Sequence, residues 1–333
     1  MDKKIYRVAL VGCGTISSNH VFALQLLDNV EIVALCDLKE ERALTVAERF
    51  SLKCKIYTDY EKMLCEQNPD AVHICTPHYL HAQMTVFALE RDINVFLEKP
   101  MCMNEAEIDL LISAEAKSKA SVCVSFQNRT TSAVKKALEV LNADGGATSA
   151  YFSVFWQRNE PYYTMSGWRG KKDTEGGGVM INQAIHSLDM LTLFFGKPKS
   201  VIATTSNHHL KGVIDVEDSC EGLIRFENGK QANFYATTSA TGTDDTHFCI
   251  TSKNHRVFLD LPNLIVDGKF YSFENEMNYV GKACYGNGHA PLIRDFYRAI
   301  DKGKEMPIPL DEAKYALKIL LAAYKSNDME III

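Results

Sequence analysis

One group of residues with the types and order needed to move a proton lies near the end of the chain's first third. Glu98, Lys99 and Pro100 directly follow the apolar run 94–97. A lysine held beside a proline at the end of a buried strand, and itself partly buried, would have a lowered pKa suited to acid–base chemistry. The alternative is an ordinary solvent-facing lysine at a strand end.

A second group follows three consecutive glycines. On a helix that begins after residues 176–178, Asn182, His186 and Asp189 fall at positions i, i+4 and i+7 and are expected to share one face. The amide and the carboxylate would fix the orientation of His186, which could then act as a general base. A lone histidine on a helix is otherwise usually a hydrogen-bonded structural side chain.

A nucleotide-binding loop is predicted near the N-terminus. The run 8–11 has the pattern of a strand, Gly12-Cys13-Gly14 that of a tight turn, and a helix begins near Ser17, which takes the place of a third glycine. The first glycine allows the turn, the second lets the backbone approach a pyrophosphate, and free N–H groups at the helix start attract its charge. The alternative is an ordinary tight turn.

Asp37 ends the next apolar run, 23 residues after Gly14, where its carboxylate could accept hydrogen bonds from an adenosine ribose and would repel a 2′-phosphate. The expected cofactor is therefore NAD, with NADP as the alternative because Arg42 lies one helical turn further on. The residues expected to bind the cofactor are Gly12, Gly14, Thr15, Ile16, Asp37, Thr76, Pro77, His81, Glu98 and Lys99.

Aromatic and cationic side chains gather just before the triple glycine, where the segment 156–170 holds both tryptophans of the chain. Aromatic faces and arginine forks suit a sugar ring or an anionic substituent. The alternative is that the tryptophans are core residues and the arginines are solvated. The expected substrate-binding residues are Lys99, Arg129, Tyr163, Trp168, Arg169, Asn182 and His186.

The elements that must position these groups change in character along the chain. Short apolar runs alternate with helical patterns over residues 1–125, as is typical of βαβ units with a parallel sheet. From about residue 130, long alternating runs joined by turn residues predict a mostly antiparallel sheet with a few helices. We therefore expect an α/β protein with one domain over 1–125 and another over 126–333.

Composition excludes several classes of protein. The chain has 333 residues and a net charge of −6, which argues against a nucleic-acid binder or a protein bound to anionic membranes. No apolar stretch approaches the roughly 18 residues of a membrane span, and the N-terminus leads directly into a strand, so a cytoplasmic protein is expected. None of its ten cysteines forms a C-x-x-C pair, so we expect no metal site.

Taken together, Gly12-Cys13-Gly14, Thr76-Pro77…His81, Glu98-Lys99-Pro100 and Gly176-Gly177-Gly178…His186…Asp189 resemble the Gfo/Idh/MocA family, the glucose-fructose oxidoreductase and inositol dehydrogenase group. The resemblance implies an N-terminal Rossmann domain with a doubly wound parallel sheet. It also implies a C-terminal α/β domain whose open, mostly antiparallel sheet covers the active site and commonly builds a homodimer or homotetramer. Lys99 would contact the reacting hydroxyl and the nicotinamide, and His186 would exchange the proton as hydride moves to or from C4.

One position departs from the pattern of the polyol-oxidising members, which often carry an aspartate four residues before the histidine. Asn182 stands there and cannot raise the basicity of His186 by ionising, which looks similar to members acting on nucleotide-linked sugars. The predicted function is an NAD(P)-dependent oxidoreductase acting on a secondary alcohol or ketone of a sugar, cyclitol or nucleotide sugar. The alternatives are an NAD-dependent glycoside hydrolase working by oxidation and elimination, and a non-catalytic dinucleotide sensor.

Overall fold

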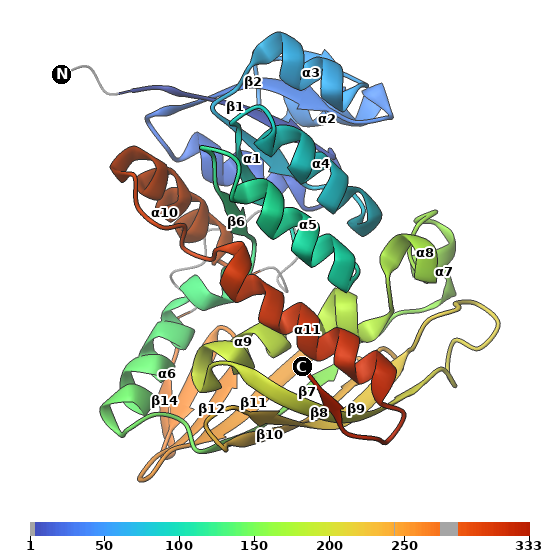
Figure 1. Ribbon diagram of the computed structural model, residues 1–333, viewed down its shortest axis with the longest axis vertical. Helices are drawn as coiled ribbons and strands as arrows, with labels where there is room; N and C mark the ends of the chain where they lie inside the picture. Colours follow the sequence, from blue (N-terminus) through green and yellow to red (C-terminus); the bar gives the residue numbers. More distant parts are fainter. Residues whose placement is uncertain (1–3, 243, 274–285) are drawn as a thin grey trace. The chain divides into compact units, whose positions relative to one another are not determined.

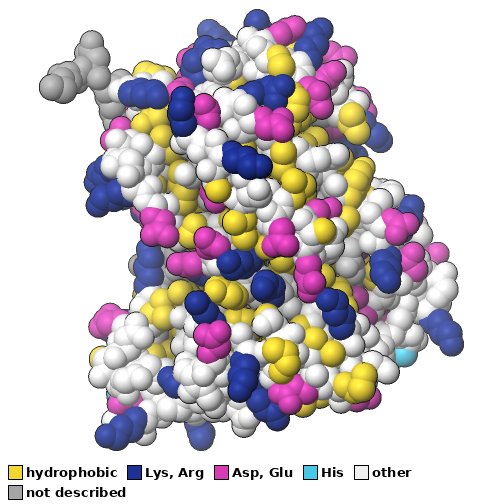
Figure 2. Space-filling model, viewed as in Figure 1, with side chains coloured by type: hydrophobic (Ala, Val, Ile, Leu, Met, Phe, Trp, Pro, Cys, Tyr) yellow, Lys and Arg dark blue, Asp and Glu magenta, His cyan; other side chains and the backbone are white. Residues whose placement is uncertain are grey.

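The computed structural model describes residues 4–242, 244–273 and 286–333, and the chain divides into two compact units (Figure 1). The first unit comprises residues 1–102, 106–127 and 278–313, and the second comprises 103–105, 128–277 and 314–333. No helix in the described part of the chain has both the length and the apolar character needed to cross a bilayer. On the face seen in Figure 2, acidic and basic side chains are interspersed over each unit.

The first unit is built on a six-stranded sheet in the order β3-β2-β1-β4-β5-β6, and every neighbouring pair is parallel. Its strands are β1 Tyr6–Val11, β2 Val30–Cys36, β3 Lys55–Tyr57, β4 Ala71–Ile74, β5 Asn94–Leu97 and β6 Val122–Val124. The strand order reverses between β1 and β4, and ligands of such sheets bind outside the carboxyl ends of the strands at this point. The prediction of a doubly wound parallel sheet is confirmed.

Helices connect the strands of this sheet because parallel neighbours require crossover connections. They are α1 Ser17–Gln25, α2 Glu40–Arg49, α3 Tyr60–Gln67, α4 His81–Leu89 and α5 Glu105–Glu115. A further helix, α10 His289–Lys302, comes from far along the chain and packs against α1. Its residues Phe296 and Tyr297 are fully or almost fully buried, so the core of this unit includes a late segment of the sequence.

The second unit contains a nine-stranded sheet in the order β14-β13-β12-β11-β7-β10-β9-β8-β15. Its strands are β7 Ser149–Phe155, β8 Pro198–Ser206, β9 Ser219–Phe226, β10 Gln231–Thr237, β11 Asp245–Thr251, β12 Arg256–Asp260, β13 Asn263–Val266, β14 Lys269–Tyr271 and β15 Ile331–Ile332. Only the pair β7 and β10 is parallel, which confirms the prediction of a mostly antiparallel sheet. A turn at Asn228-Gly229 joins β9 to β10, with Gly229 at a φ of 80°.

Helices of the second unit lie on one side of this sheet (Figure 1). They include α6 Ser132–Ala143 and α9 Ile185–Phe195, and the short helices α7 Glu160–Thr164 and α8 Lys172–Glu175 precede α9. The last helix, α11 Leu310–Ser326, begins in the first unit and ends in the second. Alternate residues of β7 are buried, while Tyr151 and Phe155 are exposed, so one face of the sheet forms the core and the other carries aromatic side chains.

Candidate active site

The glycine turn after β1 has the geometry that requires its first glycine. Gly12 has a φ of 90°, and a Cβ atom there would lie 2.5 Å from the carbonyl oxygen of Cys75. A Cβ on Gly14 would have no heavy atom within 4 Å, so the backbone at this position borders open space. The Ser17 hydroxyl donates to the Gly14 carbonyl at 2.6 Å. Ser17 is buried at the start of α1, a position that suits a small residue.

Asp37 connects the end of β2 to this turn. Its carboxylate accepts hydrogen bonds from the backbone N–H of Cys13 and from that of Lys39, both at 2.9 Å. Each oxygen keeps a second acceptor position, because a carboxylate oxygen can accept more than one hydrogen bond. The turn and the carboxylate are therefore held together before any ligand binds.

The expected cofactor-binding residues at the ends of β4 and β5 are joined by one histidine. His81 is fully buried, and its ring nitrogens lie 2.8 Å from the carbonyl oxygen of Thr76 and 2.7 Å from that of Pro100. Burial lowers the pKa of His81, and a neutral ring donates to one of the two carbonyls. His81 thus ties the two strand ends together, while the neighbouring Lys99 is partly exposed.

Glu98 is anchored in a buried polar network beneath the strand ends. Because a carboxylate only accepts, His20 Nε2 donates to Glu98 at 2.9 Å, His73 Nδ1 donates to His20 Nδ1 at 2.9 Å, and the Tyr297 hydroxyl donates to His73 Nε2 at 3.0 Å. Burial favours the neutral carboxyl, but the hydrogen bond from His20 and the nearby His289 ring outweigh it and hold the pKa of Glu98 well below its usual range. The network therefore keeps a carboxylate in place directly before Lys99.

Three members of this network also have the composition of a metal site. Ligand atoms of His20, Glu98 and His289 all lie within 4.8 Å of one another. Both ring nitrogens of His20 already take part in hydrogen bonds, which gives the cluster a role without a metal ion. The sequence analysis did not find this cluster because its members are separated by 78 and 191 positions.

The triple glycine in the second unit allows a buried carboxylate to reach the start of the next helix. Glu217 accepts hydrogen bonds from the backbone N–H of Gly178 at 2.9 Å, the N–H of Met180 at 3.0 Å and the hydroxyl of Tyr324 at 2.9 Å. A Cβ on Gly178 would overlap the Glu217 carbonyl oxygen, and one on Gly177 would overlap the Tyr324 hydroxyl. The two glycines are therefore required for this close packing.

The helix after the glycines begins with a wide turn. Residues Met180–Ala184 form a π-helical turn, and the α-helical part, α9, starts at Ile185. Such turns inside helices are frequent at functional sites. Within residues 177–192, all of them described, only Asn182 and His186 are incompletely buried. The two residues selected from the sequence are therefore the two polar side chains that this otherwise buried helix presents.

Asn182 has a carboxylate partner that the sequence analysis missed. Its Nδ2 atom donates to Glu175, which also accepts the backbone N–H of Gly170 at 2.5 Å. Burial raises the pKa of Glu175 from its ordinary 4.5 to about 7, assisted by the nearby Glu217 and opposed by the donors and by Arg169. A position directly before three glycines was the available signal, but it gave no reason to expect contact with Asn182.

Asp189 forms a buried ion pair with Arg129. Both of its carboxylate oxygens accept hydrogen bonds from the Arg129 guanidinium, at 2.7 and 2.8 Å. Asp189 is fully buried, whereas Asn182 and His186 are partly exposed. The orienting role expected of Asp189 toward His186 stays a prediction.

The segment before the triple glycine forms a stack of aromatic and cationic side chains. The guanidinium of Arg158 lies 4.7 Å from the Trp156 ring centroid and 4.9 Å from that of Tyr162. The guanidinium of Arg169 lies 4.7 Å from Tyr162 and 4.8 Å from Trp168. Five side chains thus alternate as ring, cation, ring, cation and ring. Tyr163, also selected from the sequence, is buried in an apolar cluster with Leu210, Ile214 and Val216.

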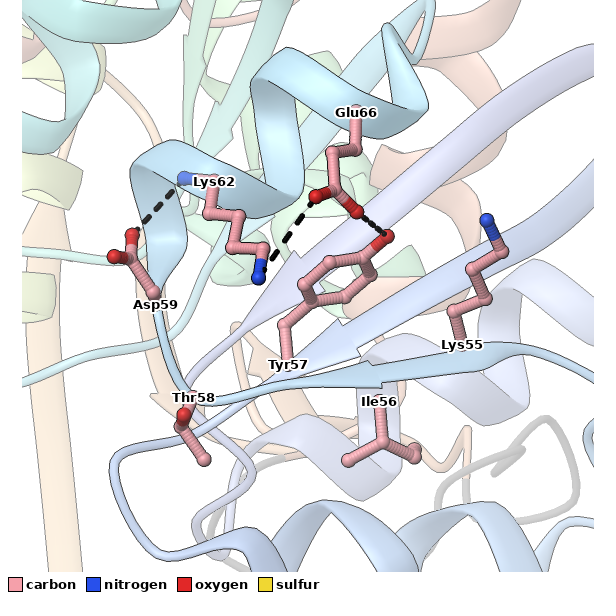
Figure 3. Close-up of a pocket in the computed structure, with 7 residues that line it drawn as sticks. All are labelled: Lys55, Ile56, Tyr57, Thr58, Asp59, Lys62 and Glu66. Atoms are coloured by element: carbon pink, nitrogen blue, oxygen red, sulfur yellow. Dashed lines mark hydrogen bonds and ion pairs between the residues drawn. The ribbon is translucent and has the colours of Figure 1, made fainter.

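A surface pocket elsewhere in the first unit contains none of the selected residues. It is lined by residues 55–59 together with Lys62 and Glu66, at the junction of β3 and α3 (Figure 3). Its polar groups pair with one another: the Tyr57 hydroxyl donates to Glu66 at 3.0 Å, and the backbone N–H of Lys62 donates to Asp59 at 2.9 Å. The first contact joins β3 to α3 and the second caps the N-terminus of α3. We therefore assign these polar groups a structural role.

Comparison with known proteins identifies the class. Residues 6–126 match a family model described as "Oxidoreductase family, NAD-binding Rossmann fold", and residues 134–257 match the "GFO/IDH/MocA C-terminal domain". The first unit is accordingly the NAD-binding domain of an oxidoreductase. The chain belongs to the Gfo/Idh/MocA family, which confirms the predicted family, enzyme class and cofactor.

Relatives of the chain include dehydrogenases of sugars and cyclitols. Myo-inositol 2-dehydrogenase of Thermotoga maritima is 22% identical over 327 residues, covering 96% of each chain. D-glucoside 3-dehydrogenase of Escherichia coli is 29% identical over 246 residues, covering 69% of each chain. The WlbA dehydrogenase from Bordetella pertussis, solved in complex with NADH and UDP-GlcNAcA, has the same fold, with a TM-score of 0.84 and 24% identity over 99% of each chain.

Proposed function

We propose that this protein interconverts a secondary alcohol and a ketone on a sugar, a cyclitol or a nucleotide-linked sugar, by hydride exchange with NAD. The family supplies the oxidoreductase class and the cofactor. The observation that carries the proposal is the exposure of Asn182 and His186 alone on a helix whose other residues from 177 to 192 are buried. A polar pair presented in this way is suited to contact a hydroxylated substrate.

The first unit has the features that a dinucleotide needs. The open space beside Gly14 leaves room for a pyrophosphate near the free N–H groups of Thr15 and Ile16, at the start of α1. The Asp37 carboxylate, already fixed by the turn, would accept hydrogen bonds from the adenosine ribose. When bound, the nicotinamide supplies a hydride acceptor or donor at C4. Thr76, Pro77 and Glu98 complete the proposed site at the strand ends.

Proton transfer is assigned to Lys99 and His186. In the oxidation direction, the His186 imidazole takes the proton of the reacting hydroxyl while Lys99 donates a hydrogen bond to the same oxygen. Asn182 orients the substrate, because its Nδ2 atom is committed to Glu175 and its Oδ1 atom is thereby directed elsewhere. Arg129, Trp168 and Arg169 belong to the proposed substrate side, together with Tyr163.

We also propose that the protein forms a homodimer or homotetramer through the open face of the large sheet. Tyr151, Phe155 and Phe258 are exposed, and Tyr151 and Phe258 both pair with Cys249 of β11 on neighbouring strands. Exposed aromatic residues gathered on one sheet face are typical of an interface between subunits. Light scattering coupled to size-exclusion chromatography measures the mass, and Tyr151→Asp is expected to shift it toward the monomer.

The test of the enzymatic proposal is reduction of the cofactor. The purified protein is titrated with NAD, NADH, NADP and NADPH, and reduced-nicotinamide absorbance is followed with a panel of sugars, cyclitols and UDP-sugars. Turnover with one substrate class is expected to fall by about 10²- to 10⁴-fold in Lys99→Ala and in His186→Ala. The exposed Lys62→Ala in α3 serves as the control and is expected to retain full activity.

Two results would count against a simple dehydrogenase. Tight dinucleotide binding without turnover on any member of the panel would favour a sensor. Release of sugar from a glycoside without net reduction of the cofactor would favour a glycoside hydrolase that oxidises, eliminates and reduces again.

A further inference from the structure

The two arginines of the aromatic stack have different electrostatic environments. Arg158 is neutralised by Asp244, since its NH1 atom lies 3.0 Å from each carboxylate oxygen. Among the described residues, Arg169 has no carboxylate within ion-pair distance, and its Nε atom is buried without a hydrogen-bond partner. Arg169 is therefore the cation of the stack that is not paired with a carboxylate among the described residues.

The orientation of Arg169 is fixed although its charge is unpaired. Its guanidinium lies between the rings of Tyr162 and Trp168, at 4.7 and 4.8 Å from their centroids. The backbone before it is also held, because the Arg169 N–H donates to the Ser166 hydroxyl at 2.9 Å. A planar fork restrained by stacking loses little conformational entropy when it binds a carboxylate or a phosphate.

The stack adjoins the helix that carries the proposed substrate-binding residues. The Tyr162 hydroxyl, on one side of Arg169, lies 3.4 Å from Nδ2 of Asn182. A ligand group held by Arg169 would thus lie one side chain away from Asn182, within the reach of a sugar-sized molecule.

One carboxyl that interacts with the charge of Arg169 is that of Glu175, and it neutralises the guanidinium only in part. Glu175 is almost fully buried and its oxygens accept hydrogen bonds from Gly170 and from Asn182. Burial raises the pKa of Glu175 to about 7, so at neutral pH this carboxyl carries only part of a charge. The local balance around Arg169 is therefore positive.

We propose that Arg169 binds an anionic substituent of the substrate, a carboxylate or a phosphate, and that the preferred substrates are acidic sugars rather than neutral ones. This inference rests on the proposed function, because it places a sugar-like molecule beside Asn182. The two sources of negative charge share the same chemistry, since both offer paired oxygens to a guanidinium fork.

The test compares ligands with and without an acidic substituent on the sugar. Isothermal titration calorimetry of the NADH-loaded protein is carried out with glucose, glucuronate, glucose 6-phosphate, UDP-glucose and UDP-glucuronate. Binding of the acidic member of at least one matched pair is expected to be tighter by about tenfold or more, which corresponds to one charge-assisted hydrogen-bonded contact. The uronate arms report a carboxylate subsite and the sugar-phosphate arm reports a phosphate subsite.

Three variants assign the effect to Arg169. Arg169→Gln is expected to reduce the acid preference to within about twofold. Arg169→Lys keeps the charge, loses the fork and should give an intermediate preference. Lys171→Gln removes an equal charge from the same loop, where Nζ of the exposed Lys171 donates to the Gly167 carbonyl at 3.2 Å, and should leave the preference unchanged.

The outcomes separate this inference from the proposed function. Equal binding of acidic and neutral ligands by the unaltered protein, or a preference that survives in both Arg169 variants, overturns the inference even if neutral sugars reduce NAD. An acid preference that is lost in Arg169→Gln supports it even if no sugar reduces NAD, in which case the dehydrogenase proposal fails by itself. Unchanged NADH affinity and circular dichroism verify that the variants are folded.

Discussion

Replacing Glu175 with glutamine tests how the site holds Asn182. The carboxyl of Glu175 is buried and has its pKa raised from 4.5 to about 7, so the folded protein favours the protonated form. Its contribution to stability is fully present below pH 4.5 and is lost as the pH rises through 7. The shift corresponds to about 3 kcal/mol, at about 1.4 kcal/mol for each pH unit.

Glutamine is neutral at every pH, so the Glu175→Gln variant does not lose this stability as the pH rises. We expect the free energy of unfolding of Glu175→Gln, measured relative to the unaltered protein, to increase by about 3 kcal/mol between pH 4.5 and pH 8. Denaturant unfolding at several pH values, followed by circular dichroism, gives the difference at each pH. Any constant effect of the substitution cancels, because only the change of the difference with pH is used.

The same substitution is expected to lower activity. A glutamine amide that approaches Asn182 with its own NH₂ group would favour rotation of the Asn182 amide, exchanging the oxygen and nitrogen it presents to a ligand. Loss of one oriented hydrogen bond predicts a decrease of about 10- to 100-fold in kcat/KM. The exposed Glu61→Gln in α3 is the control for both measurements. A stability difference that does not change with pH, or matches that of Glu61→Gln, would refute the reasoning.

Three further substitutions test contacts within the two units. Gly12→Ala should destabilise the protein by more than about 1 kcal/mol, because its φ is 90° and the added carbon would lie 2.5 Å from the Cys75 oxygen. Gly14→Ala should keep the free energy of unfolding within about 0.5 kcal/mol of the unaltered protein, yet weaken NADH binding in a fluorescence titration. Equal unfolding midpoints for Gly12→Ala and Gly14→Ala would contradict the expected difference in stability. Asp189→Asn should cost about 3 to 5 kcal/mol in denaturant unfolding by removing the carboxylate charge that pairs with the buried Arg129 side chain, and a loss below 1 kcal/mol would show that the pair is solvated.

Local patterns in the sequence predicted the fold and the placement of the nucleotide loop. The run at 6–11, the turn at Gly12 and the carboxylate at Asp37 lie close together in the chain, and each has a composition that suits one conformation. Parallel strands with apolar residues on both faces leave little choice of sheet type. Because the carboxyl ends of parallel strands lie at one edge of a sheet, the sequence also predicted that the ends of β4 and β5 lie on the same edge as the loop.

Contacts between distant segments could not be predicted in this way. Glu217 caps the helix start near Gly178, 39 positions earlier, and Tyr324 joins it from 107 positions later. Nothing in the local sequence of these residues distinguishes them from ordinary core or surface positions. The wide turn at Met180–Ala184 was also unpredicted, because its residue types suit a regular helix equally well. Such details depend on tertiary packing.

The late segment of the first unit has a consequence for synthesis of the protein. Tyr297 completes the hydrogen-bonded network beneath β4 and β5, the His289 ring lies 3.5 Å from Glu98, and α10 packs against α1. A ribosome that has released only residues 1–127 has therefore produced a Rossmann sheet with an uncovered apolar helix face and buried polar groups that lack partners. The nucleotide-binding unit, although encoded first, can complete its core only after residues 289–302 have emerged, so its first strands wait for most of the chain.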